Sequence, residues 1–386
     1  MDQAIPGLKD YWKWDSLLGE CGAIEGLTDD DRARARSAIT VLRRELGEDF
    51  LAESWSAHHP LPYFLTNSAP WTRKWLAWFG DALDHASRQA NYRSLLQRLK
   101  DGRTYDEAIS VLEVHSRFSG VGFSVQFDPA VVVGGVPKKP DLLAVNPSTN
   151  EEVFIEVTDL HNSDVTSQAS DTARVIADLL IFRHTDVKHA GRIHKPLSHR
   201  HLADVAKKVA AFLESVESGS EFRSLSLPGV IDLGASPSNA EADLAAWATA
   251  QKLAVGELIG PSFEFEEVRR VKHAIRNKRL QIPDAGTGVV VIRASGVLYE
   301  GKDVPTLFSE LEEGVFDFEK ILAAVVIAGW TGVGRNATLR HNEHTVVQSV
   351  RHDVRVENAF FVFNRYYANG LSEETIGMVR RAYGIS

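Results

Sequence analysis

The sequence predicts an α/β fold with a mixed sheet, and three features of its patterning predict it. The first is a hairpin of two short apolar runs, residues 142–145 and 153–157, joined by turn-forming residues. The second is an amphipathic helix at 104–119 followed by a strand at 122–128. The third is a helix at 264–280 followed by an apolar run of strand length. Strands that alternate with helices indicate a sheet flanked by helices.

The hairpin carries two carboxylates, Asp141 at the start of its first strand and Glu156 within its second. A turn at residues 146–150 places the two acids roughly opposite each other, about 5 Å apart at Cβ. Glu156 and Thr158 share a face because side chains alternate along a strand. Two acids in an apolar hairpin resist burial unless a cation lies between them or one keeps its proton. We therefore expect a hard divalent metal ion there, Mg²⁺ or Mn²⁺.

These residues resemble a known motif. Pro140-Asp141 on one strand and Glu156-Val157-Thr158 on the next are similar to the motif of the PD-(D/E)xK nuclease superfamily. The resemblance implies a restriction endonuclease-like core, in which Asp141, Glu156 and the backbone carbonyl of Val157 hold the metal. Thr158 stands where the family has a lysine that orients or activates the attacking water. Thr158 can at most hydrogen-bond that water, so another lysine has to take the role.

The family has members in which a neighbouring helix supplies this lysine. In related families a helix of the form AIxxKxxQ precedes the next strand, and Ala274, Ile275, Lys278 and Gln281 match it, before a strand expected at 287–293. Lys278 is therefore the favoured replacement. The alternatives, in order of preference, are Lys272 on the same helix and the pair Lys207 and Lys208 on a helix expected at 201–215.

A third acid is often found on the first helix of such nucleases, and the helix at 104–119 offers Glu107 and Glu113. At about 100° per residue, Glu107 falls within the apolar arc of that helix, whereas Glu113 lies nearly opposite it. The periodicity therefore favours Glu107 as the inward-facing metal ligand. Glu113 stays open as the alternative because the ends of a predicted helix shift by a few residues.

The chain of 386 residues is long enough for one large elaborated domain or two. We expect a helical region at 1–100 and a restriction endonuclease-like α/β domain at 101–386, interrupted by a helical insertion at 161–262. Thr28 and the three aspartates after it predict the start of a helix that ends near Gly47. The histidine-rich stretch that follows the hairpin is expected to be a basic loop rather than a metal site.

Composition excludes several classes of protein. The single cysteine rules out a disulfide framework and fits the cytoplasm, and no apolar run approaches the length of a membrane helix. The net charge of −9 means that nucleic acid has to be bound through local patches. Two basic stretches follow the hairpin in the sequence: residues 183–208 hold seven Lys or Arg, and residues 269–279 hold six.

The sequence thus predicts a cytoplasmic, Mg²⁺- or Mn²⁺-dependent nuclease that hydrolyses phosphodiester bonds, with DNA favoured over RNA as its substrate. The resemblance leaves room for a homodimer, and we expect no membrane partner. The alternative is a catalytically inactive nuclease-fold module that binds nucleic acid or a protein partner. Thr158 at the lysine position and the acidic net charge motivate that alternative.

Overall fold

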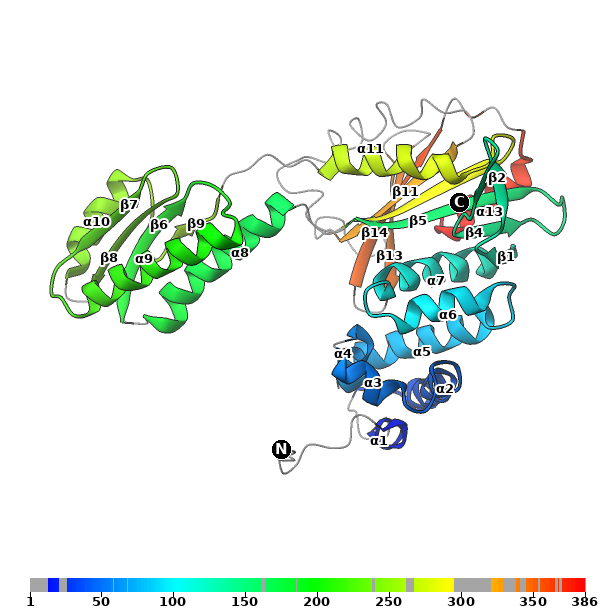
Figure 1. Cartoon of the computed structure of the whole chain (residues 1–386), viewed down its shortest axis with the longest axis horizontal. Coiled ribbons are helices and arrows are strands. Elements are labelled where there is room, and N and C mark those ends of the chain that lie inside the picture. The colour runs from blue at the N-terminus through cyan, green and yellow to red at the C-terminus, as the bar shows by residue number, and fades with distance from the viewer. Residues whose placement is uncertain are drawn as a thin grey trace. The chain divides into compact units, whose positions relative to one another are not determined.

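A computed structural model describes most of the chain. The described residues are 13–20, 26–57, 59–67, 69–160, 164–184, 186–237, 240–261, 267–294, 321–329, 338–340, 345–352, 355–364, 367 and 370–385. The chain divides into a large unit, Met1–His161 with Val268–Ser386, and a small unit, Asn162–Glu267 (Figure 1). Within the described residues, no helix combines the length and the apolar character needed to cross a membrane.

The large unit begins with a series of helices. They are α1 (Trp14–Glu20), α2 (Asp29–Leu46), α3 (Phe50–Ser56), α4 (Pro60–Thr66), α5 (Pro70–Ala86), α6 (Tyr92–Lys100) and α7 (Tyr105–Gly120). The predicted helix after Thr28 is confirmed as α2, and it starts with a capping box. The Thr28 hydroxyl accepts a hydrogen bond from the Asp31 N–H, and the Asp31 carboxylate accepts one from the Thr28 N–H, each 3.1 Å long.

An eight-stranded mixed sheet follows, in the order β1-β4-β5-β10-β11-β14-β13-β12. Its strands are β1 (Ser124–Phe127), β4 (Leu142–Val145), β5 (Glu152–Leu160), β10 (Thr287–Ala294), β11 (Ile321–Gly329), β12 (Thr338–Arg340), β13 (Thr345–His352) and β14 (Arg355–Phe363). A separate exposed hairpin, β2 (Val131–Val133) and β3 (Val136–Lys138), lies between β1 and β4 in the chain. The α/β class and the mixed sheet flanked by helices are thereby confirmed.

Helices cover both faces of this sheet. Alternate residues of β5 and β10, including Ile155, Val157 and Val291, belong to one buried cluster that also contains Val111 of α7. The opposite face carries Glu156 and is approached by α11 (Glu267–Lys278), so α7 and α11 lie on opposite sides of the sheet (Figure 1). The last helix, α13 (Glu373–Ala382), contacts α7.

The helices before residue 100 share their core with the sheet. Leu42 of α2, Leu83 of α5 and Leu99 of α6 belong to the same buried cluster as the strands. The sequence interpretation set residues 1–100 apart as a helical region; in the structure they form one compact unit with the sheet. Helices α5 and α6 pack against α7, and α2 packs against α5 and α6, so successive helices connect to the sheet.

The small unit is itself α/β, which corrects the prediction of a helical insertion. Its helices are α8 (Asp164–Asp178), which continues as a π-helix (Leu179–Arg183), α9 (His199–Glu217) and α10 (Glu241–Ala250). Its sheet has the order β7-β8-β6-β9, with β6 (Val187–Ile193), β7 (Arg223–Leu227), β8 (Ile231–Pro237) and β9 (Leu258–Ile259).

Three strands of the small unit were missed for physical reasons. The histidine-rich stretch expected to be a loop contains β6, whose sequence VKHAGRI has no apolar run; it is a strand because it pairs with β8 and β9. The Pro- and Gly-containing segment at 225–239 contains most of the β7–β8 hairpin, whose turn holds Gly229 at a φ of 66°. A turn and a linker share the same residue types, so only strand pairing distinguishes them.

Candidate active site

The two carboxylates of the β4–β5 hairpin meet at the start of β4. Leu142 pairs with Ile155, so Asp141, one residue earlier, falls opposite Glu156. The backbone N–H of Val157 donates a hydrogen bond of 2.9 Å to Asp141 Oδ2. Asp141 is 8% exposed and Glu156 is 0% exposed. The register therefore buries both acids together, as the hairpin pattern predicts.

Lys278 reaches this pair from the last residue of α11. Its Nζ lies 3.0 Å from Glu156 Oε2 and 3.5 Å from Asp141 Oδ2. The structure thus brings together the three residues that the sequence favoured, from segments more than a hundred residues apart. Of the alternative lysines, Lys272 lies earlier on the same helix, half-buried, and Lys207 and Lys208 lie exposed on α9 of the small unit.

Burial sets the electrostatics of the site. Loss of solvent, and secondly the charge of Asp141, raise the pKa of Glu156 to about 8, although the ammonium of Lys278 opposes the shift. Burial alone would lower the pKa of Lys278, but the charges of Asp141 and Glu156 outweigh it and raise that pKa. Glu156 Oε1 is buried and accepts no hydrogen bond from any described residue. One oxygen of the site is therefore available to a ligand.

Arg98 of α6 is a further member of the site that the sequence did not indicate. Its guanidinium lies 3.3 Å from Asp141 Oδ1, 3.5 Å from Glu107 Oε1 and 3.9 Å from Asp128 Oδ1. It therefore connects Asp141 with two other acids. Arg98 lies beside Leu99 on an amphipathic helix, where an arginine is ordinarily a surface residue, so its spacing gave no signal.

The two candidate third acids occupy different places. Glu107 lies in the first turn of α7 with its side chain 40% exposed, and it forms an ion pair with Arg98 of the site. Glu113 is buried between Arg117 and Arg293. The expectation that Glu113 points away from the core is wrong. Helix α7 packs against the sheet on one side and against α5, α6 and α13 as well, so it has no single apolar face.

The donor set suits a small hard cation. Asp141 and Glu156 supply carboxylate oxygens, one of them without a hydrogen-bond partner among the described residues, and such oxygens are what Mg²⁺ and Mn²⁺ prefer. No three His, Cys, Asp or Glu side chains in the described part of the chain are grouped to hold a metal ion. Glu107 is thus not placed as a third ligand. Val157 contributes its N–H to Asp141, and Thr158 follows Glu156 on the same face of β5.

Comparison with known proteins adds no assignment. No protein-family model, curated protein or solved structure matches the chain.

Proposed function

We propose that this protein is a metal-dependent nuclease with a restriction endonuclease-like core that hydrolyses phosphodiester bonds, with DNA favoured over RNA. One observation carries the proposal: Lys278 Nζ lies 3.0 Å from Glu156 and 3.5 Å from Asp141, although the three side chains come from three separate elements. A lysine beside two buried acids is the arrangement that the motif requires, with the lysine supplied by α11 instead of by position 158.

The order of elements around the site supports the same proposal. Helix α7 is followed by β1, β4 and β5, then by α11 and β10, and the four strands are adjacent in the sheet. β1, β4 and β5 pair antiparallel in sequence order, and β10 pairs parallel to β5. A core of helix, three strands, helix and strand is what the resemblance implies. The small unit is inserted between β5 and α11, which explains why the acids and the lysine are distant in sequence.

Asp141 and Glu156 would hold Mg²⁺ or Mn²⁺, with the carbonyl of Val157 as the further ligand implied by the resemblance. The metal supplies Lewis acidity toward the phosphate and lowers the pKa of a bound water. Glu156 has to lose its proton before it can bind a cation, and the ammonium of Lys278 favours that loss. Asp141 is held in place by the N–H of Val157 and by Arg98.

Lys278 has the charge and the position to act on the reaction itself. Its ammonium, 18% exposed, faces both acids and can orient a water or offset the negative charge that develops on the phosphate. Thr158 has only a hydroxyl, so it can hydrogen-bond a water but adds no charge. Arg269 and Arg276 lie exposed on α11, the helix that carries Lys278, and an acidic protein needs such local positive charge to bind nucleic acid. A cytoplasmic setting belongs to the same proposal.

The test is cleavage of labelled single- and double-stranded DNA and RNA with Mg²⁺ or Mn²⁺, comparing the wild type with Asp141→Asn and Glu156→Gln. We expect cleavage by the wild type, its loss on addition of EDTA, and its loss in both variants while their circular dichroism stays native. Cleavage retained by a folded Glu156→Gln protein would overturn the assignment of the site.

A second candidate is a nuclease-fold module that binds nucleic acid, or a protein partner, without cleaving. The observation that favours it is the neutralisation of both acids by cations of the protein, Lys278 on one side and Arg98 on the other. Under this alternative, nucleic acid binds at low salt, but no divalent metal produces cleavage. Turnover in the assay above therefore decides between the two candidates.

A further inference from the structure

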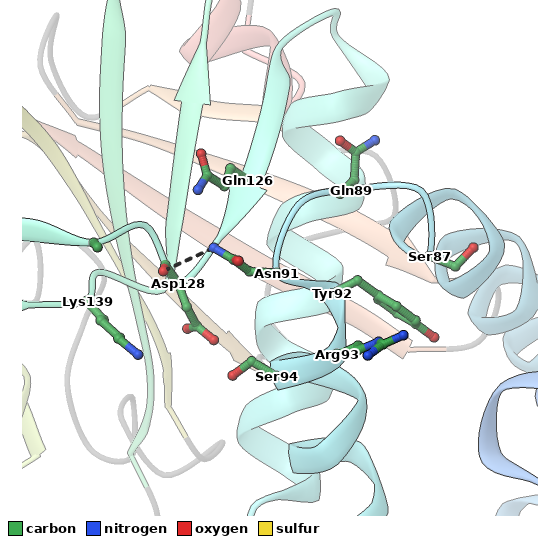
Figure 2. A pocket seen from close by; sticks show the side chains of 10 residues that line it. Ser87, Gln89, Asn91, Tyr92, Arg93, Ser94, Gln126, Asp128 and Lys139 are labelled. Carbon is green, nitrogen blue, oxygen red and sulfur yellow. Dashed lines mark hydrogen bonds between the residues drawn. The ribbon is translucent and has the colours of Figure 1, made fainter.

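A pocket of about 700 Å³ lies beside the candidate active site, where the connection between α5 and α6 faces β1 and the base of the β2–β3 hairpin (Figure 2). It is lined by Ser87, Gln89, Asn91, Tyr92, Arg93, Ser94, Gln126, Asp128, Ala130 and Lys139. Its volume is within the range that holds a small organic molecule. Nine of the ten lining side chains carry a polar group, which favours a polar ligand over an apolar one.

Several polar groups of the lining are available for a ligand. Among the described residues, none forms an ion pair with Arg93 or Lys139, and none hydrogen-bonds the side chains of Gln89, Gln126 or Ser94. By contrast, the Tyr92 hydroxyl is occupied by Glu45 at 3.0 Å. The lining therefore offers two cations for a phosphate and two side-chain amides, each with a donor and an acceptor for the edge of a base.

The pocket has a rigid corner. The side-chain amide of Asn91 donates hydrogen bonds to the carbonyl oxygens of Phe127, at 2.8 Å, and of Asp128, at 3.4 Å (Figure 2). The Phe127 N–H in turn donates to the Ala90 carbonyl at 3.3 Å. These bonds fix the helical side of the pocket to β1, so the lining groups hold their positions before a ligand arrives.

The same corner connects the pocket to the acids. Asp128 lines the pocket and lies 3.9 Å from the guanidinium of Arg98, which is 3.3 Å from Asp141. Lys139, also in the lining, is two residues before Asp141. The contacts from Asp128 to Arg98 and from Arg98 to Asp141 therefore join the pocket to the candidate active site.

We propose that this pocket binds one unpaired nucleotide of the substrate strand, next to the phosphate that is cleaved. The inference rests on the proposed nuclease function and names its substrate class: a strand with a nucleotide that can leave the base stack. Lys139 contacts its phosphate, and Gln126 binds the base edge. A base whose Watson–Crick edge is bound by a glutamine amide cannot at the same time pair in a duplex.

The test measures base unstacking without requiring turnover. Full-length Glu156→Gln protein is mixed with single-stranded oligonucleotides and with duplexes. Each carries one 2-aminopurine, and the position of this base differs by one nucleotide from one oligonucleotide to the next. Unstacking raises the fluorescence of this base. We expect a severalfold rise at one position, and loss of that rise in Gln126→Ala and Lys139→Ala, with binding about tenfold weaker.

The matched controls are Gln97→Ala and Lys100→Ala. Both residues are exposed on α6 and lie outside the pocket, and both variants should bind and unstack the oligonucleotide like the parent Glu156→Gln protein. Equal fluorescence in Gln126→Ala and Gln97→Ala would overturn the inference, as would a flat signal at every position. Adenosine monophosphate is a separate probe that tests whether the pocket binds a free nucleotide instead of a nucleotide within a strand. Binding of adenosine monophosphate that an oligonucleotide does not displace would also overturn the inference. Cleavage by the wild type is scored separately, so failure of the nuclease proposal and failure of the pocket give different results.

Discussion

Two buried glutamates on opposite faces of the same sheet have different surroundings. Glu156 of β5 faces α11, and Glu113 of α7 lies on the face covered by α7. Glu113 Oε1 accepts hydrogen bonds from Arg117 at 2.6 and 3.1 Å, and its Oε2 contacts the guanidinium of Arg293. Both of its oxygens are therefore bound by arginine, whereas Glu156 has one lysine and one oxygen without a hydrogen bond among the described residues.

The difference separates an acid that stabilises the fold from one that is ready for chemistry. An acid between two arginines is satisfied as an anion, and arginine keeps its charge at any physiological pH. The pKa of Glu156 is instead raised to about 8 by burial and by Asp141, so this carboxyl exchanges its proton within the physiological range. Perturbed pKa values of this kind mark sites where a cation or substrate completes the charge balance.

The largest expected effect is on turnover. Replacing Glu156 with Gln should lower the rate of metal-dependent cleavage by about 10³-fold or more, roughly 4 kcal/mol in the activation barrier, because an amide cannot act as an anionic ligand. Glu113→Gln is the matched control, since it makes the same change on the other face. Its specific activity per folded molecule should equal that of the wild type. An equal loss of cleavage rate in Glu113→Gln and Glu156→Gln would contradict the distinction between the two acids.

The free energy of unfolding should respond in the opposite way to these two substitutions. Glu113→Gln removes the anion between Arg117 and Arg293 and should lower the free energy of unfolding by about 3 kcal/mol. Glu156→Gln should leave that free energy unchanged or raise it, because a buried group that is costly to ionise is replaced by a neutral one. Urea denaturation of the metal-free proteins measures both. Equal destabilisation by the two substitutions would contradict the comparison.

The lysine of the site can be moved from α11 to β5 by substitution, which tests whether its charge or its original position matters. Lys278→Ala should reduce cleavage by about 10²-fold, since a positioned cation of this kind contributes that order of rate. The double variant Lys278→Ala with Thr158→Lys returns a lysine to the face of β5 that carries Glu156 and should recover part of the loss. The matched control is the double variant Lys278→Ala with Glu152→Lys, which places a lysine at an exposed position of the same strand and should recover no cleavage. Full activity of Lys278→Ala alone would remove Lys278 from the reaction.

The smallest effect concerns pH. Because the folded-state pKa of Glu156 is about 8 and the value in an unfolded chain is about 4.5, the folded protein holds more protons between these values. The stability of metal-free protein should therefore fall as the pH rises from about 5 to 8. Denaturation of the wild type and of Glu156→Gln at each pH, in EDTA, isolates the contribution. A difference between them that does not change with pH would refute it.

Local patterns determined much of the site. Alternation and turn residues fixed the β4–β5 hairpin, and the register that follows places Asp141 opposite Glu156. The helix and strand after the insertion were likewise predictable, because α11 has a clear apolar stripe and β10 is a continuous apolar run. The stripe of that helix left Lys272 and Lys278 both open, and the resemblance to the AIxxKxxQ helix of related families favoured Lys278. These features depend on neighbours in the chain, which is the range over which periodicity carries information.

The tertiary structure decided which residues from distant segments join the candidate site. Arg98 joins the site only because α6 packs beside α7, and Glu113 is buried only because α7 is covered on more than one side. The strand β6 exists because β8 and β9 pair with it, since its own sequence, VKHAGRI, has no apolar run. Burial, and with it the raised pKa of Glu156, depends on the whole packed unit. The sequence by itself therefore indicated which groups form the candidate site, and long-range packing set their charge, their partners and the pocket beside them.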